Sequence, residues 1–383
     1  MKILIAPDSF KDCLPANEVA RFIELGILKV FPDAEIIKIP LADGGEGTVE
    51  ALVNATGGKI INIQVHDPLM RKIDSFFGIL GNRKTAIIEM AAASGIELLT
   101  EKERNPWLTT TFGTGELIKA ALDFGCQTIL IGIGGSATVD GGAGMVQALG
   151  VELLDKKNKS IAKGGKGLAQ LNTINTDTLD VRLKGKKIWV ACDVKNPLLG
   201  ENGAAKVFGP QKGANPEMIN KLEQNLAHYS EVIETQLGVA IANIPGTGAA
   251  GGLGAGFMAF LNAEIKPGFE LISEIVHLAE QIVNADLVIT AEGKIDYQTR
   301  FGKTPAGVAG IAKNFNKPLL AFAGSLGPRV DSLNELGFTS IIPITDKPMS
   351  LQESITNAGE LLQNATERTM SILKLDYWGL SEK

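Results

Sequence analysis

The sequence predicts an α/β fold built on sheets that are mostly parallel. It contains 44 glycines in 383 residues, and many of them stand between a short apolar run and a helix-like run, as is typical of α/β proteins. The apolar runs are rich in β-branched residues and do not alternate strictly with polar ones, as expected for strands covered on both faces. The length favours two domains, or one domain with a large insertion.

The N-terminal part begins with two strand–helix pairs. The run KILIAP predicts a strand, and residues 15–31 after it place apolar side chains at helical spacing. The run EIIKIPLADGG at 35–45 predicts a second strand that ends in an acid and two glycines, and a helix is expected at 46–55.

The rest of the chain continues this pattern. A hairpin is expected over 72–90, with Gly81 and Asn82 at its turn. Helices are expected at 305–315 and 350–374, and the glycine-rich stretch 244–261 leads into an apolar helix. Further strands are predicted at 59–67, 85–91, 127–134, 186–193, 286–293, 317–324 and 339–345.

Charge and composition exclude several classes of function. The net charge is −6 and no cluster of Lys and Arg is interleaved with aromatic residues, which argues against a nucleic-acid partner. The three cysteines and three histidines are dispersed, so a zinc ribbon, a disulfide framework and a histidine-based nucleophile are poorly supported. The N-terminus is too polar for a signal peptide and no apolar stretch reaches membrane-spanning length, so we expect a cytoplasmic protein with no membrane partner.

A glycine-rich loop at 131–150, IGIGGSATVDGGAGMVQALG, follows a predicted strand. It is not a P-loop, because Met145 and Val146 stand where that motif has Lys and Ser or Thr. It also departs from the dinucleotide fingerprint, because Ala137 occupies the place of the third glycine. The alternatives are an anion-binding nest of backbone N–H groups and tight packing of backbone through glycine, and we favour phosphate binding.

Acidic residues follow the first two predicted strands. Asp8 and Lys11 could bind a metal or clamp an anion, or serve as a helix cap and a solvated lysine. Asp43 and Glu46 stand among three glycines, which are more than a cap requires, and this favours a functional role such as binding Mg²⁺ or substrate hydroxyls.

Two later loops carry further charged residues. Asp193 ends a strand, where a helix cap is the alternative, and the following glycine-rich loop contains Lys212. Glu292, Asp296 and Lys303 lie within twelve residues, and Lys303 comes shortly before a proline suited to begin a helix. Carboxylates, lysines and glycine loops, with few histidines and thiols, fit phosphoryl transfer better than hydride transfer. The residues alone therefore predict an α/β enzyme that handles a phosphorylated ligand, a kinase.

Eight motifs, in order and over nearly the whole chain, resemble those of the bacterial glycerate kinases (the glycerate 2-kinase family). They are APDSFKDCL (6–14), PLADGGEGT (40–48), TFGTGELI (111–118), GIGGSATVDGGAGMVQALG (132–150), ACDVKNPLLG (191–200), FGPQKGA (208–214), GAAGGLGAG (248–256) and TAEGKIDYQTRFGKTP (290–305).

The resemblance implies an ATP-dependent kinase that converts D-glycerate to 2-phosphoglycerate and ADP, with Mg²⁺. It also implies two α/β domains with the active site in the cleft: a Rossmann-like domain built from both chain ends (1–62 and 285–383), and an inserted mixed α/β domain (63–284) that carries the glycine-rich phosphate loops. A kinase of another small hydroxy or sugar acid, and a non-catalytic nucleotide- or sugar-acid-binding regulator, are the alternatives.

Carried onto this sequence, the resemblance implies three groups of site residues. The residues expected to face glycerate and the transferring phosphoryl group are Asp8, Lys11, Asp43, Glu46, Glu292 and Lys303. The base that accepts the hydroxyl proton is expected to be Asp193 or Asp296. Those expected to cradle ATP, or alternatively the glycerate carboxylate, are Gly134, Gly135, Ser136, Gly141, Gly142 and Lys212.

Overall fold

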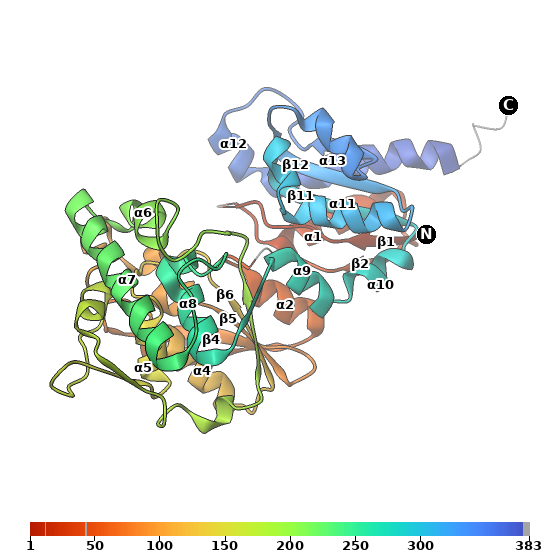
Figure 1. Ribbon diagram of the computed structural model, residues 1–383. Coiled ribbons are helices and arrows are strands. Elements are labelled where there is room, and N and C mark those ends of the chain that lie inside the picture. The colour runs from red at the N-terminus through yellow and green to blue at the C-terminus, as the bar shows by residue number, and fades with distance from the viewer. Residues whose placement is uncertain (12, 43, 378–383) are drawn as a thin grey trace. The chain divides into compact units, whose positions relative to one another are not determined.

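The computed structural model describes residues 1–11, 13–42 and 44–377, and the side chains of all of these but 376 and 377. The chain forms two compact units (Figure 1). The first unit comprises Met1–Asp43, Glu50–Thr56 and Phe269–Lys383, and the second comprises Gly44–Val49 and Gly57–Gly268. The predicted domain boundaries after residues 62 and 284 stay a prediction.

The first unit contains a five-stranded parallel sheet with the order β13-β12-β11-β1-β2. Its strands are β1 (Lys2–Ile5), β2 (Glu35–Lys38), β11 (Leu287–Ile295), β12 (Leu319–Leu326) and β13 (Ser340–Pro343). The helices in or entering this unit are α1 (Ala16–Val30), α2 (Thr48–Thr56), α9 (Gly268–Ile275), α10 (Leu278–Val283), α11 (Thr304–Asn314), α12 (Leu351–Thr356) and α13 (Ala358–Tyr377).

Helices cover both faces of this sheet. On one face α1 and α13 lie side by side (Figure 1) and share a core with Ile3 and Ile5 of β1 and with Phe322 of β12. The intervening strand residues, such as Leu4 and Val288, point to the other face and are also fully buried, and α11 packs against β11. In the central strands β1, β11 and β12, residues that point to either face are buried, so these strands carry continuous apolar runs, as predicted from the sequence. The edge strands β2 and β13 are only partly buried.

The second unit contains a six-stranded mixed sheet with the order β10-β9-β6-β5-β4-β3. The strands β5, β6, β9 and β10 are parallel to one another. The strand β4 pairs antiparallel with both of its neighbours, β3 and β5. The bounds are β3 (Lys59–His66), β4 (Lys72–Ile79), β5 (Thr85–Glu89), β6 (Thr128–Gly132), β9 (Lys187–Ala191) and β10 (Glu264–Lys266). The predicted hairpin is confirmed, and Asn82 shapes its turn because its side chain accepts hydrogen bonds from the N–H groups of Lys84 and Thr85.

Around this sheet stand helices, short 3₁₀ turns and a two-stranded antiparallel sheet of β7 and β8. The bounds are α3 (Ala91–Ser94), η1 (Ile96–Leu98), η2 (Glu101–Glu103), α4 (Phe112–Asp123), α5 (Ala143–Ala148), β7 (Glu152–Leu154), β8 (Thr173–Asn175), α6 (Ala204–Phe208), η5 (Pro210–Lys212), α7 (Pro216–Leu237) and α8 (Ala249–Leu261). The mixed α/β fold expected from the sequence is therefore confirmed.

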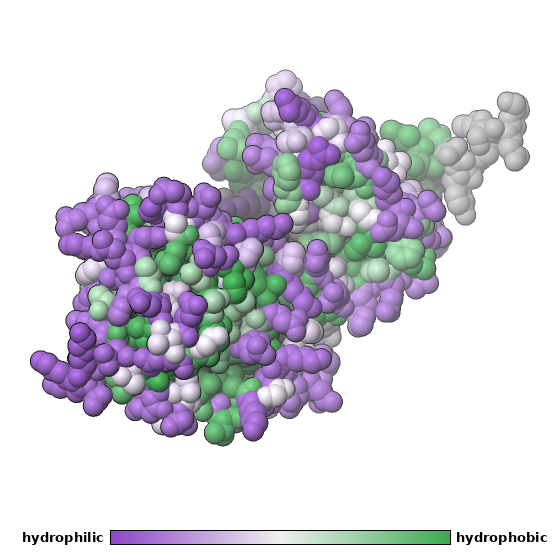
Figure 2. Space-filling view, viewed as in Figure 1, coloured by the Kyte–Doolittle hydropathy of each residue, from purple (hydrophilic) through white to green (hydrophobic). Residues whose placement is uncertain are grey.

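Hydrophilic side chains cover most of the surface visible in Figure 2, with smaller hydrophobic areas between them. Within the described residues, no helix is both long enough and apolar enough to cross a membrane.

Candidate functional site

Asp8 lies at the carboxyl end of β1, at the edge of the first unit's sheet where ligands of parallel α/β sheets bind. Its backbone N–H donates to the carbonyl of Ala291, which continues the pairing with β11. The carboxylate accepts a hydrogen bond of 2.7 Å from the backbone N–H of Ser9 and one of 2.6 Å from the hydroxyl of Thr304 at the start of α11. Asp8 is thereby fixed beside the N-terminus of α11.

Glu292 and Lys303 form an ion pair at the same edge. The Lys303 Nζ lies 2.6 Å from the Glu292 Oε1, and the two side chains are 41% and 14% exposed respectively. Glu292 belongs to β11 itself, which continues to Ile295 because it pairs with β12 as far as Leu326. Lys303 directly precedes α11, so its charge adds to the positive end of that helix.

Asp296 follows β11 and caps the short helix η6 (Tyr297–Arg300). The backbone N–H of Gln298, which donates to its carboxylate, holds the pKa of Asp296 below the usual value, and the ammonium groups of Lys294 and Lys303 contribute in the same direction. The carboxylate is therefore ionised at neutral pH and can accept a hydrogen bond. Asp8, Glu292, Asp296 and Lys303, four of the predicted residues, thus lie at one sheet edge.

The structure gives fewer contacts for the other residues that are predicted to face the substrate. Lys11 is exposed in the turn after Asp8, and its backbone lies against Gly293. Glu46 is exposed just before α2 and belongs to the second unit. Asp43 lies outside the described residues.

Asp193, the other candidate base, follows β9 in the second unit and is exposed. Its carboxylate accepts a hydrogen bond of 2.9 Å from the backbone N–H of Gly268, the first residue of α9. This contact is the capping role that the sequence left open for Asp193. A capping carboxylate on an exposed loop still has a face toward solvent, so its role as a base stays a prediction.

In the glycine-rich loop, exposure differs between its two halves. Gly134 and Gly135 are exposed and Ser136 is 8% exposed, whereas Gly141 and Gly142 are buried. Direct contact with a ligand is therefore open to the first half of the loop, Gly134–Ser136.

The buried glycines let backbone segments approach closely. A Cβ atom on Gly132 would lie 2.2 Å from the carbonyl oxygen of Gly44. A Cβ on Gly251, at the kinked start of α8, would lie 1.9 Å from the carbonyl of Thr138, and the Gly251 carbonyl accepts the N–H of Gly141 at 3.1 Å. The packing alternative thus accounts for several glycines of the two glycine-rich motifs.

Asp140 stands between the glycine pairs of the loop and is fully buried. Its carboxylate accepts hydrogen bonds from the backbone N–H groups of Thr111, Gly142 and Gly144, at 2.8–3.2 Å, and from the hydroxyls of Thr110 and Thr111. Burial raises the pKa of Asp140, and the hydrogen bonds oppose this shift. Asp140 joins the TFGTGELI motif to the loop, a role that its position between two glycine pairs did not reveal.

Lys212 lies under the same loop although it is 76 residues from Ser136. It is 1% exposed, and its Nζ donates to the Ser136 Oγ at 2.6 Å and to the Thr138 carbonyl at 2.7 Å. The structure therefore brings together the predicted Lys212 and Ser136.

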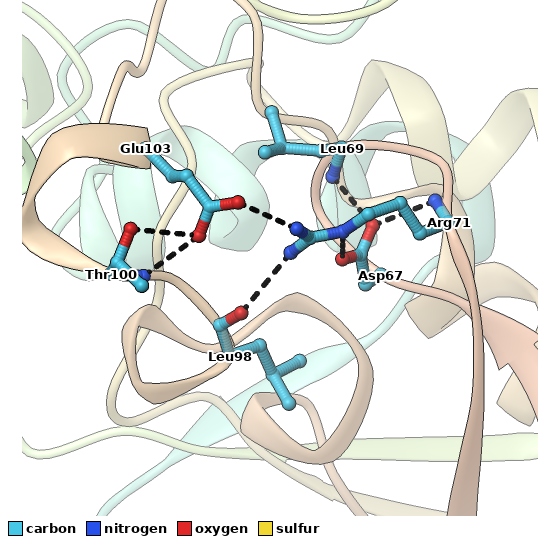
Figure 3. Close-up of polar contacts among 6 residues, drawn as sticks. All are labelled: Asp67, Leu69, Arg71, Leu98, Thr100 and Glu103. Carbon is cyan, nitrogen blue, oxygen red and sulfur yellow. Dashed lines mark hydrogen bonds and ion pairs between the residues drawn. The ribbon is translucent and has the colours of Figure 1, made fainter.

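The exposed half of the loop is also held from its side by the segment 94–98. The N–H of Ile96 donates to the carbonyl of Gly135, and the N–H of Ala137 donates to that of Ser94. Figure 3 shows what fixes the continuation of this segment: the Arg71 guanidinium reaches the Leu98 carbonyl and the Glu103 carboxylate, the latter at 2.6 Å.

The same network orders the turn between β3 and β4 (Figure 3). The Asp67 carboxylate accepts the backbone N–H groups of Leu69 and Arg71 at 2.8 Å and also pairs with the Arg71 guanidinium. In this turn the Pro68 carbonyl accepts the N–H of Thr110, whose hydroxyl donates to Asp140. The network thus supports the glycine-rich loop through Thr110.

Within the described part of the chain, no group of three or more His, Cys, Asp or Glu side chains is arranged to hold a metal ion. Carboxylates are nevertheless the donors that Mg²⁺ prefers, and in phosphoryl-transfer enzymes one or two of them suffice beside phosphate oxygens and water. The carboxylates at the sheet edge of the first unit fit that smaller donor set.

Comparison with known proteins gives consistent matches over the whole chain. The model of the "Glycerate kinase family" matches residues 3–374. The chain is 49% identical to "Glycerate 2-kinase" of Escherichia coli, with 98% of each chain covered. It is 48% identical to "Glycerate kinase" of Haemophilus influenzae, covering 98% of this chain and 100% of that one. A crystal structure described as a glycerate kinase 2 from Salmonella typhimurium LT2 superposes with a TM-score of 0.91 at 48% identity, and 99% of each chain is covered.

Proposed function

We propose, because this chain belongs to the glycerate kinase family, that it transfers the γ-phosphoryl group of ATP to a hydroxyl of D-glycerate. It is a kinase, a phosphotransferase with an alcohol acceptor, and its products are 2-phosphoglycerate and ADP. The observation that carries the proposal is the similarity to curated glycerate kinases at about 48% identity over 98% of the chain. The 2-position follows the name of the Escherichia coli relative.

Phosphoryl transfer requires positioning and charge stabilisation more than covalent help from the protein. We assign Lys303 and the N-terminus of α11 to the transferring phosphoryl group, whose negative charge they would balance. Asp8, Lys11, Asp43, Glu46 and Glu292 are proposed to face glycerate. Support comes from the contacts of Asp8 with Thr304 and of Glu292 with Lys303, which hold two of these carboxylates at the same sheet edge.

For the acceptor of the hydroxyl proton we propose Asp296 over Asp193. The Asp296 carboxylate lies at the sheet edge that carries Lys303, and it is held ionised by the N–H of Gln298 and by Lys294, whose Nζ lies 3.3 Å away. Asp193 accepts a comparable backbone N–H, that of Gly268, but it belongs to the second unit. A carboxylate with a lowered pKa is a weak base, but in phosphoryl transfer it also orients the attacking hydroxyl.

For the nucleotide we propose that Gly134, Gly135 and Ser136 contact the ATP phosphates, and that Gly141, Gly142 and Lys212 support them from below. Successive backbone N–H groups in such a turn form an anion-binding concavity. Mg²⁺ is proposed to enter as the ATP complex, where it would neutralise phosphate charge, with one or two carboxylates as its protein ligands.

A coupled ADP-release assay with D-glycerate, ATP and Mg²⁺ tests the reaction, and phosphorus NMR of the product tests the 2-position. Turnover with tartronate or another sugar acid but not with D-glycerate would transfer the proposal to that substrate. Binding of ATP without any turnover would favour a regulator. D-Glycerate and ATP are the proposed partners, and a cytoplasmic location and the absence of a nucleic-acid partner stay predictions.

Paired variants test the base. We expect D296N to lower kcat by roughly 100-fold or more with little change in KM, and D193N to lower it less. Near-normal turnover of D296N would exclude Asp296.

A further inference from the structure

Lys212 is buried in the second unit. Lysine side chains are rarely buried in proteins unless they are paired. Only 1% of Lys212 is exposed, and the Nζ has two oxygen partners, the Ser136 hydroxyl and the Thr138 carbonyl. Both partners belong to one three-residue stretch of the glycine-rich loop. Lys212 therefore holds this stretch from the side opposite to solvent.

The backbone of Lys212 is itself fixed. It ends the short helix η5 (Pro210–Lys212), in which its N–H donates to the carbonyl of Gly209. The side chain therefore extends from an ordered segment, and the position of its Nζ is set by the fold.

The carboxylate of Asp140, in the same loop, acts electrostatically on Lys212. Burial lowers the pKa of Lys212 from 10.5 to about 7, and Asp140 acts in the opposite direction. At neutral pH the ammonium and the neutral amine are thus both populated. Since Lys212 is buried, its ammonium is poorly screened and acts on the exposed half of the loop.

We propose that Lys212 is a positioning residue: from beneath the loop it holds Ser136 and Thr138 so that the backbone N–H groups of Gly134–Ser136 are presented to the polyphosphate of ATP, and its charge strengthens that contact. The inference rests on the proposed function, because it assigns ATP to this loop. Lys212 acts through Ser136, and it does not itself reach solvent.

The test compares K212M, which removes the donors and the charge, with K212Q, which keeps a donor without the charge. The matched control is K221M, since Lys221 is an exposed lysine of α7 that pairs with its helical neighbour Glu217. We expect the KM for ATP to rise about tenfold or more in K212M, less in K212Q, and not in K221M. The KM for D-glycerate should stay within about twofold of the wild-type value.

A pH profile separates this role from a merely structural one. As pH rises through about 7 the ammonium of Lys212 is lost, so the KM for ATP should rise in the wild type and stay flat in K212M. S136A serves as a second variant if K212M does not fold, because it removes one hydrogen-bond partner of Lys212 without adding side-chain volume. It should raise the same KM by a smaller factor.

An unchanged KM for ATP in K212M and S136A, or a rise only in the KM for D-glycerate, would overturn the inference. Failure of the proposed function is distinguishable: the wild-type chain would then release no ADP with D-glycerate, while calorimetric titration with ATP would still measure the effect of K212M on nucleotide affinity.

Discussion

Replacement of Asp140 by Asn tests whether the glycine-rich loop depends on a buried carboxylate. The substitution is nearly isosteric, but it exchanges one acceptor oxygen for an NH₂ group. The Oδ2 has the shorter bond, 2.8 Å from the N–H of Thr111, so we expect the amide oxygen to keep that place. The NH₂ group then faces the N–H of Gly142, which at present donates to the Oδ1 at 3.2 Å.

The magnitude follows from these contacts. The N–H of Gly142 and one N–H of the new amide are left buried without an acceptor, at about 1–3 kcal/mol each. Removal of a buried charge, whose burial raises the pKa of Asp140, offsets part of this cost. We expect D140N to lower the free energy of unfolding by about 2–4 kcal/mol, and to lower the Tm of the second unit by roughly 5–15 °C.

Urea unfolding followed by tryptophan fluorescence measures this change. Trp107 and Trp189 both belong to the second unit, so a W378F background confines the signal to that unit. The matched control is D155N, because a single oxygen of Asp155 accepts both of its backbone N–H bonds and an amide oxygen can replace it. A D140N protein within about 0.5 kcal/mol of the wild type, like D155N, would refute the reasoning.

Two further substitutions address the sheet edge and the loop packing. K303M should lower kcat/KM by roughly 100- to 1,000-fold in the steady-state assay. The free energy of unfolding should change by no more than about 1 kcal/mol, because the ion pair with Glu292 is partly exposed. A loss of activity smaller than tenfold would contradict a role at the phosphoryl group. G251A should destabilise the second unit by about 2–5 kcal/mol, measured by urea unfolding. The reason is that Gly251 has a φ of +69° and that a Cβ there would lie 1.9 Å from the Thr138 carbonyl oxygen. A G251A protein as stable as the wild type would show that the close approach of the two backbone segments is not required.

The central strands, such as β1, β5, β6 and β11, could be predicted from the sequence because both of their faces are covered and each reads as one apolar run. The two-stranded sheet of β7 and β8 could not, since each strand is only three residues long and ELL and TIN carry no pattern. The helix α7 is not among the predicted helices, although its sequence begins with a typical start, Asn215 followed by Pro216. In the structure Asn215 caps the helix by accepting a hydrogen bond from the N–H of Met218.

The sequence predicts candidate site residues where a charged residue follows a strand. It does not predict the hydrogen-bond and ion-pair partners of these residues. Asp8 could be predicted from its position after a strand, but the hydroxyl that donates a hydrogen bond to it belongs to Thr304, 296 residues away. Contacts of this kind depend on the order of strands in the sheet, which places β1 beside β11. The residue types predict a chemistry, while only the topology decides which of them meet.

The glycine-rich loop contains glycines that backbone packing requires, and a contact of Gly141 and Gly142 with a ligand stays a prediction. Its density of glycines suggested a cradle along its whole length, yet Gly132 is required by the approach of Gly44, and Gly141 and Gly142 are buried. Glycine at a ligand contact and glycine at a backbone contact are indistinguishable in sequence, because both reflect the absence of a Cβ atom. Exposure separates them: Gly134 and Gly135 are exposed, and the buried Lys212 fixes the adjoining Ser136. We therefore expect a phosphate to bind at Gly134–Ser136, while Asp140 holds the buried half of the loop through Gly142 and Gly144.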